Sequence, residues 1–124
     1  MAKYVDGFVL VVPKGKEAAY EEMARQGRDS WMKHGALQYF ECRGDDLKPQ
    51  EMGDEKSRAF PEMAGATADE NVWFSLIVFN SKEHRDEVNK KVMAEMESYD
   101  VGEFEMPNDM KKMAYGGFAV VVEG

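Results

Sequence analysis

The feature that most constrains this chain is residues 71–79, where both alternating sets of side chains are apolar. A strand in a half-exposed antiparallel sheet alternates between apolar and polar residues, because one face packs on the core and the other meets water. In this stretch one set is Val72, Phe74, Leu76 and Val78, and the other is Trp73, Ser75, Ile77 and Phe79. Residues 4–12 behave alike, with Phe8, Leu10 and Val12 opposing Val5, Val9 and Val11. The sequence therefore predicts a sheet that is covered on both faces.

The rest of the chain predicts two long helices and two further strands. Residues 16–34 carry apolar or small residues at spacings of three and four, as in an amphipathic helix, and Gly35 follows where a left-handed residue ends a helix. Ser81 is placed to cap a second helix that runs to about residue 96. The other predicted elements are strands at 36–43 and 115–122, a short helix near 60–64 in the long connection 44–70, and an irregular piece before the last strand.

The order strand, helix, strand, strand, helix, strand is the ferredoxin-like βαββαβ pattern. It predicts an α+β fold in which two helices cover one face of an antiparallel sheet. At 124 residues there is room for one domain, which we place at residues 1–124. The second face of the sheet would be a large apolar patch in water, and monomeric proteins rarely tolerate such a patch. We therefore expect a homodimer that pairs sheet to sheet.

Charge and cysteine content exclude several classes of partner. The formal net charge is −8, and an acidic surface opposes the release of counterions by which proteins bind nucleic acid, so we expect no nucleic-acid partner. Anionic membranes are disfavoured for the same reason, and no apolar run approaches the roughly 20 residues that span a bilayer. Asp6 and Gly7 interrupt the N-terminal segment, which is unlike a signal peptide. Cys42 is the only cysteine, which fits a reducing compartment, so we expect a cytoplasmic protein with Cys42 as a buried, inert thiol.

Short matches from one end of the chain to the other give it a resemblance to a known family. They include Tyr4-Val5-Asp6-Gly7-Phe8-Val9, Trp31-Met32-Lys33-His34-Gly35, Tyr39-Phe40-Glu41-Cys42, Phe74-Ser75-Leu76-Ile77-Val78, His84-Arg85-Asp86 and Tyr115-Gly116-Gly117-Phe118. With these pieces the chain resembles the YbaA family of small bacterial proteins, a domain of unknown function. The resemblance implies a ferredoxin-like fold of the dimeric α+β barrel type, a superfamily that includes cofactor-free monooxygenases, heme-degrading enzymes and proteins of no known activity. It implies no catalytic residue, because no reaction is established for this group.

Asp6 is the acidic residue most out of place in the predicted sheet. It interrupts an apolar strand, and a buried carboxylate needs a partner. Arg85 and Lys91 on the second helix are the candidate partners. An ion pair and a contact to a ligand are both consistent with the pattern, because structural networks and active sites both perturb carboxylates.

The two histidines also allow two interpretations each. His34 ends the first helix on its apolar face, where it caps the last carbonyls or contacts a ligand. His84 lies in the first turn of the second helix, where a neutral ring is favoured that either caps the turn or accepts a proton or a metal. Two histidines and one cysteine without close spacing predict no metal site.

Two functional hypotheses follow, and the sequence does not decide between an enzyme and a non-enzyme. In the first, the domain binds a small, partly apolar molecule between sheet and helices, without a cofactor, since few polar groups in an apolar cavity are the usual form of a ligand site. The predicted ligand-binding residues are Asp6, Trp31, His34, Tyr39, Trp73, His84 and Arg85, with Phe74 as a further wall. In the second, the protein is a non-catalytic homodimer that acts through an interaction surface.

Overall fold

The structure is a computed structural model that describes residues 2–50, 53, 56–98 and 106–124. The strands are β1 (Tyr4–Pro13), β2 (Gln38–Arg43), β3 (Glu70–Phe79) and β4 (Ala114–Ala119). The helices are α1 (Glu17–Lys33), α2 (Phe60–Ala64) and α3 (Lys82–Glu97), with 3₁₀ turns η1 (Lys14–Lys16) and η2 (Met110–Lys112). Each predicted helix and strand is found, while part of the predicted irregular piece, residues 99–105, lies outside the described residues.

The four strands form one antiparallel sheet in the order β2-β3-β1-β4. The two apolar stretches that dominate the sequence, β1 and β3, are its central strands and pair along ten residues each. Val5 lies opposite Val78, and Val9 lies opposite Phe74. Because directly opposed residues share a face, this register divides the strands into the same two sets that the alternation predicts.

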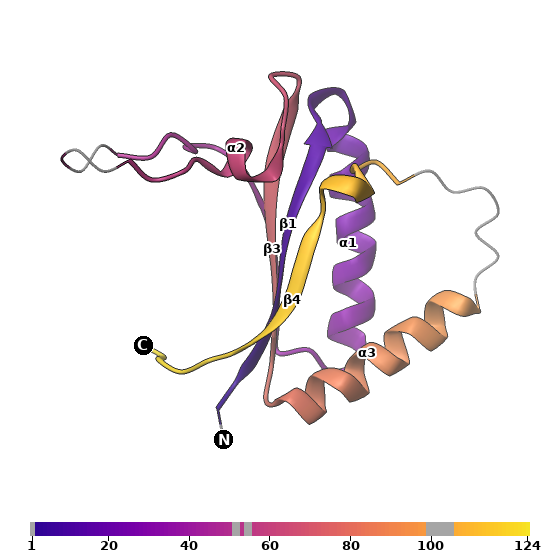
Figure 1. Cartoon of the computed structure of the whole chain (residues 1–124). Coiled ribbons are helices and arrows are strands. Elements are labelled where there is room, and N and C mark those ends of the chain that lie inside the picture. Colours follow the sequence, from indigo (N-terminus) through magenta and orange to yellow (C-terminus); the bar gives the residue numbers. More distant parts are fainter. Residues whose placement is uncertain (1, 51–52, 54–55, 99–105) are drawn as a thin grey trace.

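Helices α1 and α3 lie on one side of the sheet, which we call the helix face (Figure 1). Side chains of this face pack with side chains of the two helices and with Ala36 to form two buried clusters. One packs beneath α1 and contains Leu10, Val12, Tyr20, Ala24 and Trp73; the other packs beneath α3 and contains Ala36, Ile77, Phe79, Val88 and Val92. Phe8 of β1 contacts both clusters and joins them into a continuous apolar layer.

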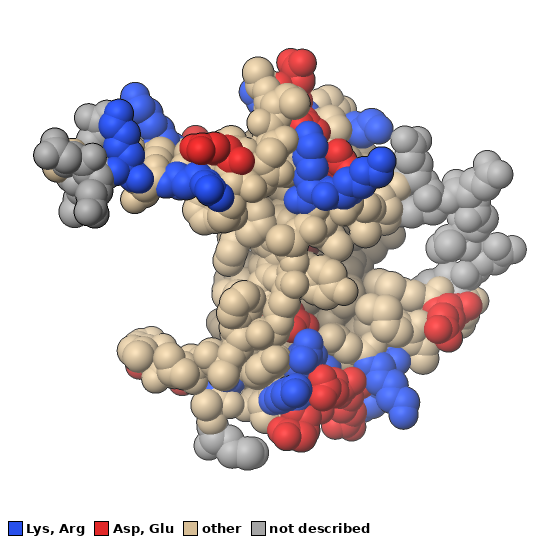
Figure 2. All heavy atoms as spheres, viewed as in Figure 1, with Lys and Arg blue, Asp and Glu red and all other residues tan. Residues whose placement is uncertain are grey.

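The opposite side of the sheet, which we call the open face, carries no charged residue along its central rows. Its side chains are those of Val5, Gly7, Val9, Val11, Gln38, Phe40, Cys42, Val72, Phe74, Leu76, Val78, Ala114, Gly116 and Phe118. α2 covers one end, where Val11 and Val72 are buried. Away from it, Phe40, Phe74 and Phe118 are 45%, 43% and 59% exposed. Figure 2 shows this uncharged surface between the segment that carries α2 and the C-terminal segment.

The expectation that Cys42 is buried is wrong. Cys42 is exposed, because β2 is an edge strand and Cys42 points to the open face opposite Phe74. The sequence shows that the residue lies in a strand, but it does not show that the strand lies at the edge of the sheet.

Local geometry explains where α1 and β4 end. Gly35 has φ +114°, a left-handed value that disfavours side chains, and it stops α1 as predicted. β4 ends at Ala119, three residues earlier than predicted. Its last pair is Tyr4 with Ala119, after which Val120 donates only one hydrogen bond, to the carbonyl of Lys3. β4 therefore ends opposite Tyr4, the residue at which β1 begins.

Candidate functional site

Asp6, the buried acid predicted from the sequence, is 5% exposed on the helix face of β1. Its Oδ1 accepts a hydrogen bond from Nη1 of Arg85 at 3.0 Å, and its Oδ2 accepts one from Nδ2 of Asn89 at 3.3 Å. Burial raises the pKa of the Asp6 carboxyl, while Asn89 and Arg85 act to lower that pKa. Lys91 instead lies 3.5 Å from Glu87. Of the two candidate cations, Arg85 is therefore the one that pairs with Asp6.

The Asp6 pair belongs to a polar network that joins β1, α1 and α3. The Oδ1 of Asn89 accepts a hydrogen bond from the Trp31 indole at 3.0 Å. The Arg85 guanidinium lies over the Tyr4 ring, 4.9 Å from its centroid, and its Nε is 2.8 Å from Asp86. Each polar partner of Asp6 is thus held by at least one further contact, as in a structural network.

The two histidines contact protein groups at two separate places. The Nε2 of His34 bonds to Oε2 of Glu95, which connects the end of α1 to α3. The Nδ1 of His84 accepts a hydrogen bond from the backbone N–H of Asn80 at 2.9 Å, while the backbone N–H of His84 donates to the capping Oγ of Ser81 at 3.1 Å. His84 therefore caps the turn before α3, one of its two predicted roles, and its Nδ1 is an acceptor in this arrangement.

A second polar centre forms around Glu41, a residue of β2 that points to the helix face. Its Oε1 accepts a hydrogen bond from the Tyr39 hydroxyl at 2.7 Å. Its Oε2 accepts one from the Tyr20 hydroxyl at 2.9 Å and another from Ser75 Oγ. Three hydroxyl groups from α1, β2 and β3 thus converge on one carboxylate, which we call the Glu41 centre.

The hydroxyls of the Glu41 centre remain donors over the whole physiological pH range. Burial raises the pKa of both Tyr20 and Tyr39 far above the usual value of 10.0, and the negative charge of Glu41 raises it further. Gly27 on α1 makes room for this arrangement, because a Cβ at that position would lie 3.0 Å from the Tyr39 hydroxyl. The two tyrosines are therefore neutral donors to the carboxylate of Glu41.

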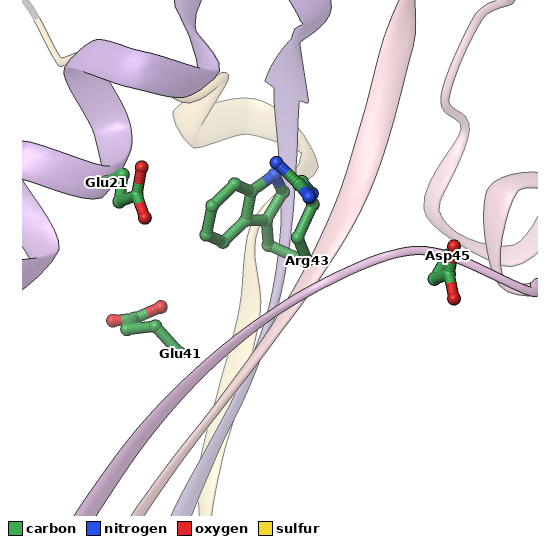
Figure 3. A pocket seen from close by; sticks show the side chains of 5 residues that line it. Glu21, Glu41, Arg43 and Asp45 are labelled. Carbon is green, nitrogen blue, oxygen red and sulfur yellow. The ribbon is translucent and has the colours of Figure 1, made fainter.

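The Glu41 centre opens into a surface groove between α1 and the edge strand β2. Two adjoining cavities of about 420 and 300 Å³ share Glu21, Glu41 and Trp73 in their walls. Arg43 and Asp45 line the first cavity, and the second is lined in addition by Ala24, Arg25, Arg28, Tyr39 and Phe40. In Figure 3, Glu21 and Glu41 lie on one side, Asp45 on the other, and Arg43 between them. Trp73 donates its indole N–H to Glu17 at 2.8 Å, so its polar group is already satisfied.

The structure separates the predicted ligand-binding residues. Asp6, Trp31 and Arg85 share one network, His34 and His84 lie at the helix ends, and Tyr39 and Trp73 line the groove. One link between the first and last groups is the contact of the Trp31 and Tyr39 rings, whose centroids are 6.2 Å apart. Phe74 is not a wall of this region; it lies on the open face because it alternates with Trp73.

Sequence reasoning missed the central residue of the groove, although a signal existed. Glu41 follows Tyr39 by two positions, so both point to the same side of their strand. Once Tyr39 is assigned to the helix face, a carboxylate must enter the same layer and needs donors there. Ser75, the one polar residue in its apolar set, points to the same place. Asn89 of the Asp6 network lies on a helix and gives no comparable signal.

The side chains that line the groove define the contacts that it offers. Within the described residues, no three His, Cys, Asp or Glu side chains gather closely enough to hold a metal ion. The groove offers an oriented carboxylate, arginine side chains and an indole ring. These groups can hydrogen-bond, pair with charge and stack, which is the chemistry of ligand binding.

Comparison with known proteins identifies the family. A model of the family described as "Protein of unknown function (DUF1428)" matches residues 3–110. The chain belongs to this family. The family description assigns no activity.

The relatives agree with this assignment. The "Uncharacterized protein YbaA" of Escherichia coli is 40% identical over 121 residues, which cover 98% of each chain, and a protein of the same description from Shigella flexneri matches equally well. Among solved structures, the de novo designed protein Foldit4 aligns over 98% of this chain and 99% of its own, with a TM-score of 0.43 and 9% identity, too remote to inform function. Across the described residues, no helix has both the length and the apolar character needed to cross a membrane.

Proposed function

We propose that this chain is a cytoplasmic homodimer of the dimeric α+β barrel type that binds a small, partly apolar molecule, without a cofactor, in the groove between α1 and β2. The observation that carries the binding function is the Glu41 centre. Three hydroxyl groups hold one carboxylate at the wall of a cavity, beside the indole of Trp73. The size of the larger cavity, about 420 Å³, falls within the range of small-molecule sites.

The strand order supports the ferredoxin-like part of the proposal. In the units β1-α1-β2 and β3-α3-β4, the two strands are not neighbours, because a strand of the other unit lies between them. Such split β-α-β units characterise ferredoxin-like domains. α2 is an addition to this pattern, carried on the long connection between β2 and β3.

The open face supports the homodimer. Its central rows contain no charge, and Phe40, Phe74 and Phe118 leave much of their surface in water. A second copy presents a matching apolar, uncharged surface, so face-to-face pairing desolvates no ion in these rows. A charged or nucleic-acid partner finds no complementary group there.

Light scattering on a size-exclusion column tests the assembly. We expect a mass of about 28 kDa, twice the 14.1 kDa of one chain, at micromolar concentration. Phe74→Asp places a charge in the middle of the open face and should yield a monomer, whereas Met93→Asp, at an exposed position of α3 on the other side of the sheet (Figure 1), should leave the dimer intact. A stable monomer of the unmodified chain would contradict the proposed assembly.

A fragment screen by NMR tests the groove. Binders should shift the indole N–H signal of Trp73, and Glu41→Gln should weaken them, while Glu62→Gln on α2 should not. The second candidate function, a non-catalytic interaction dimer, is favoured by the open face alone. It gains support if the protein is dimeric while no fragment of a diverse library shifts the Trp73 signal.

A further inference from the structure

The geometry of the groove points to a dipolar ligand, and this inference rests on the proposed binding function. We propose that the groove takes a small molecule with a protonated amine at one end and an acid group at the other, joined by an apolar linker. Glu41 accepts the amine, Arg43 pairs with the acid, and Trp73 contacts the linker. The three residues line the same cavity.

Glu41 is prepared to receive a single further donor. A carboxylate offers about four lone-pair directions, and three of those on Glu41 are taken by hydroxyl groups. Oε2 already accepts two bonds, whereas Oε1 accepts one, from Tyr39. The vacant direction therefore belongs to Oε1. Because the side chain cannot turn without breaking three hydrogen bonds, the anion is pre-oriented for a ligand, which lowers the entropic cost of binding.

Arg43 provides the opposite charge from the same strand. It follows Glu41 by two positions on β2, so both side chains emerge on the helix face, roughly 6–7 Å apart along the strand. Among the described residues, no carboxylate pairs with its guanidinium, and the planar group is suited to bind an acid through two hydrogen bonds. Trp73 lies directly opposite Arg43 in the sheet.

The charge balance of the groove favours a ligand that carries both signs. Its walls contain three acids, Glu21, Glu41 and Asp45, and three arginines, Arg25, Arg28 and Arg43. This local balance differs from the chain as a whole, which carries −8. Glu21 and Arg25 already pair at 3.2 Å, and Arg28 pairs with Asp29 at 3.0 Å, so the wall charges outside these two pairs are Glu41, Asp45 and Arg43. A ligand with a single charge would compensate either these acids or Arg43 and leave the charge of the other uncompensated.

A series of straight ω-amino acids that differ only in the number of methylene groups tests the inference. Titrations followed by NMR and calorimetry should show the tightest binding at one intermediate chain length, at which the amine reaches Glu41 while the acid group reaches Arg43. The alkylamine and the alkanoate of matching length should each bind about tenfold more weakly. Affinity that does not depend on chain length, or equal affinity for the half-molecules, would overturn the inference.

Two variants with matched controls locate the binding. Glu41→Gln and Arg43→Gln should each weaken the best ω-amino acid about tenfold, and amide shifts outside the groove would show that both variants are folded. Glu62→Gln and Arg58→Gln, on the segment that carries α2, should leave affinity unchanged. Other fragments that shift Trp73 while every ω-amino acid fails would overturn the dipolar ligand and leave the proposed function standing. A groove that binds neither set would refute both.

Discussion

Replacing Arg85 by Gln should destabilise the protein more than any other single change in the Asp6 network. The substitution leaves Asp6, 5% exposed, with Asn89 at 3.3 Å as its hydrogen-bond donor. Removing one member of a buried ion pair typically costs about 3–5 kcal/mol, because the other charge is left without compensation. We expect the free energy of unfolding to fall by about 3 kcal/mol, the lower end of this range. Asn89 remains as a donor to Asp6, and the Arg85 side chain is itself 20% exposed.

Replacing the other member of the pair, Asp6, should destabilise the protein less. In Asp6→Asn, the Arg85 guanidinium keeps Asp86 at 2.8 Å and the Tyr4 ring at 4.9 Å, so its charge is still compensated. We expect a loss of about 1.5–2 kcal/mol, the lower end of the value of one hydrogen bond to a charged group. The double variant contains neither buried charge and should be less destabilised than the sum of the two single variants by about 1–3 kcal/mol.

The pH dependence gives an independent check on the cause. A raised carboxyl pKa means that the folded chain holds the proton more tightly than the unfolded chain, whose value is near 3.8. The stability contributed by this group is therefore complete below that value and is lost as the pH rises through the raised pKa. Arg85 lowers the Asp6 pKa, so Arg85→Gln should raise it further and carry this loss to higher pH. The difference in free energy of unfolding between the unmodified chain and Arg85→Gln should therefore become smaller as the pH falls.

Urea denaturation of the four proteins, followed by tryptophan fluorescence between about pH 4 and 8, measures these differences from near the unfolded value of 3.8 upward. Arg58→Gln, an exposed arginine far from the network, controls for loss of a positive charge and should change the free energy of unfolding by less than about 0.5 kcal/mol. Single-variant losses that add up, with a deficit independent of pH, would refute the assignment of Asp6 and Arg85 as a coupled buried pair.

Two further predictions concern the Glu41 centre and the surface charge. Ultraviolet absorbance of phenolate should show that Tyr20 and Tyr39 do not ionise until alkali unfolds the chain. Their raised pKa values stabilise the fold below pH 10, and this contribution is lost as the pH rises above it. Normal titration of all five tyrosines near 10.0 would contradict the structure. The −8 charge predicts no tight binding to RNA or DNA at physiological salt, and a salt-dependent sub-micromolar gel shift with mixed oligonucleotides would contradict that prediction.

The architecture was readable from the sequence because it follows from periodicity. The two apolar sets of residues 71–79 predicted a central strand, and β3 is a central strand, with Trp73 and Ile77 buried on the helix face and Phe74 still 43% exposed on the open face. Gly35 and Ser81 marked a helix end and a helix start through backbone chemistry that is local to them. Asp6 was identifiable for the same reason, since one acid in an apolar strand must find a partner.

The site was less predictable because it depends on which strands are neighbours. Glu41 finds its hydrogen-bond donors only in the folded sheet. β2 lies beside β3, which brings Ser75 opposite Glu41, and α1 packs over this face and supplies Tyr20. Cys42 was misjudged for the same reason, since local sequence does not reveal that β2 is an edge strand. Both errors concern the order of strands in space, which side-chain alternation does not encode.

The two proposed roles use opposite faces of the sheet and are therefore compatible. Polar side chains that enter the sheet from the helix face, at Asp6, Glu41 and Ser75, all find donors or acceptors there, while the central rows of the open face carry no charge. Phe40 is where the two regions approach each other, because it points to the open face from the edge strand and also lines the groove. Pairing of two open faces would therefore leave the carboxylate of Glu41 accessible and change the groove only at this rim. A Phe74→Asp monomer should accordingly retain ligand binding, with any change in affinity arising through Phe40.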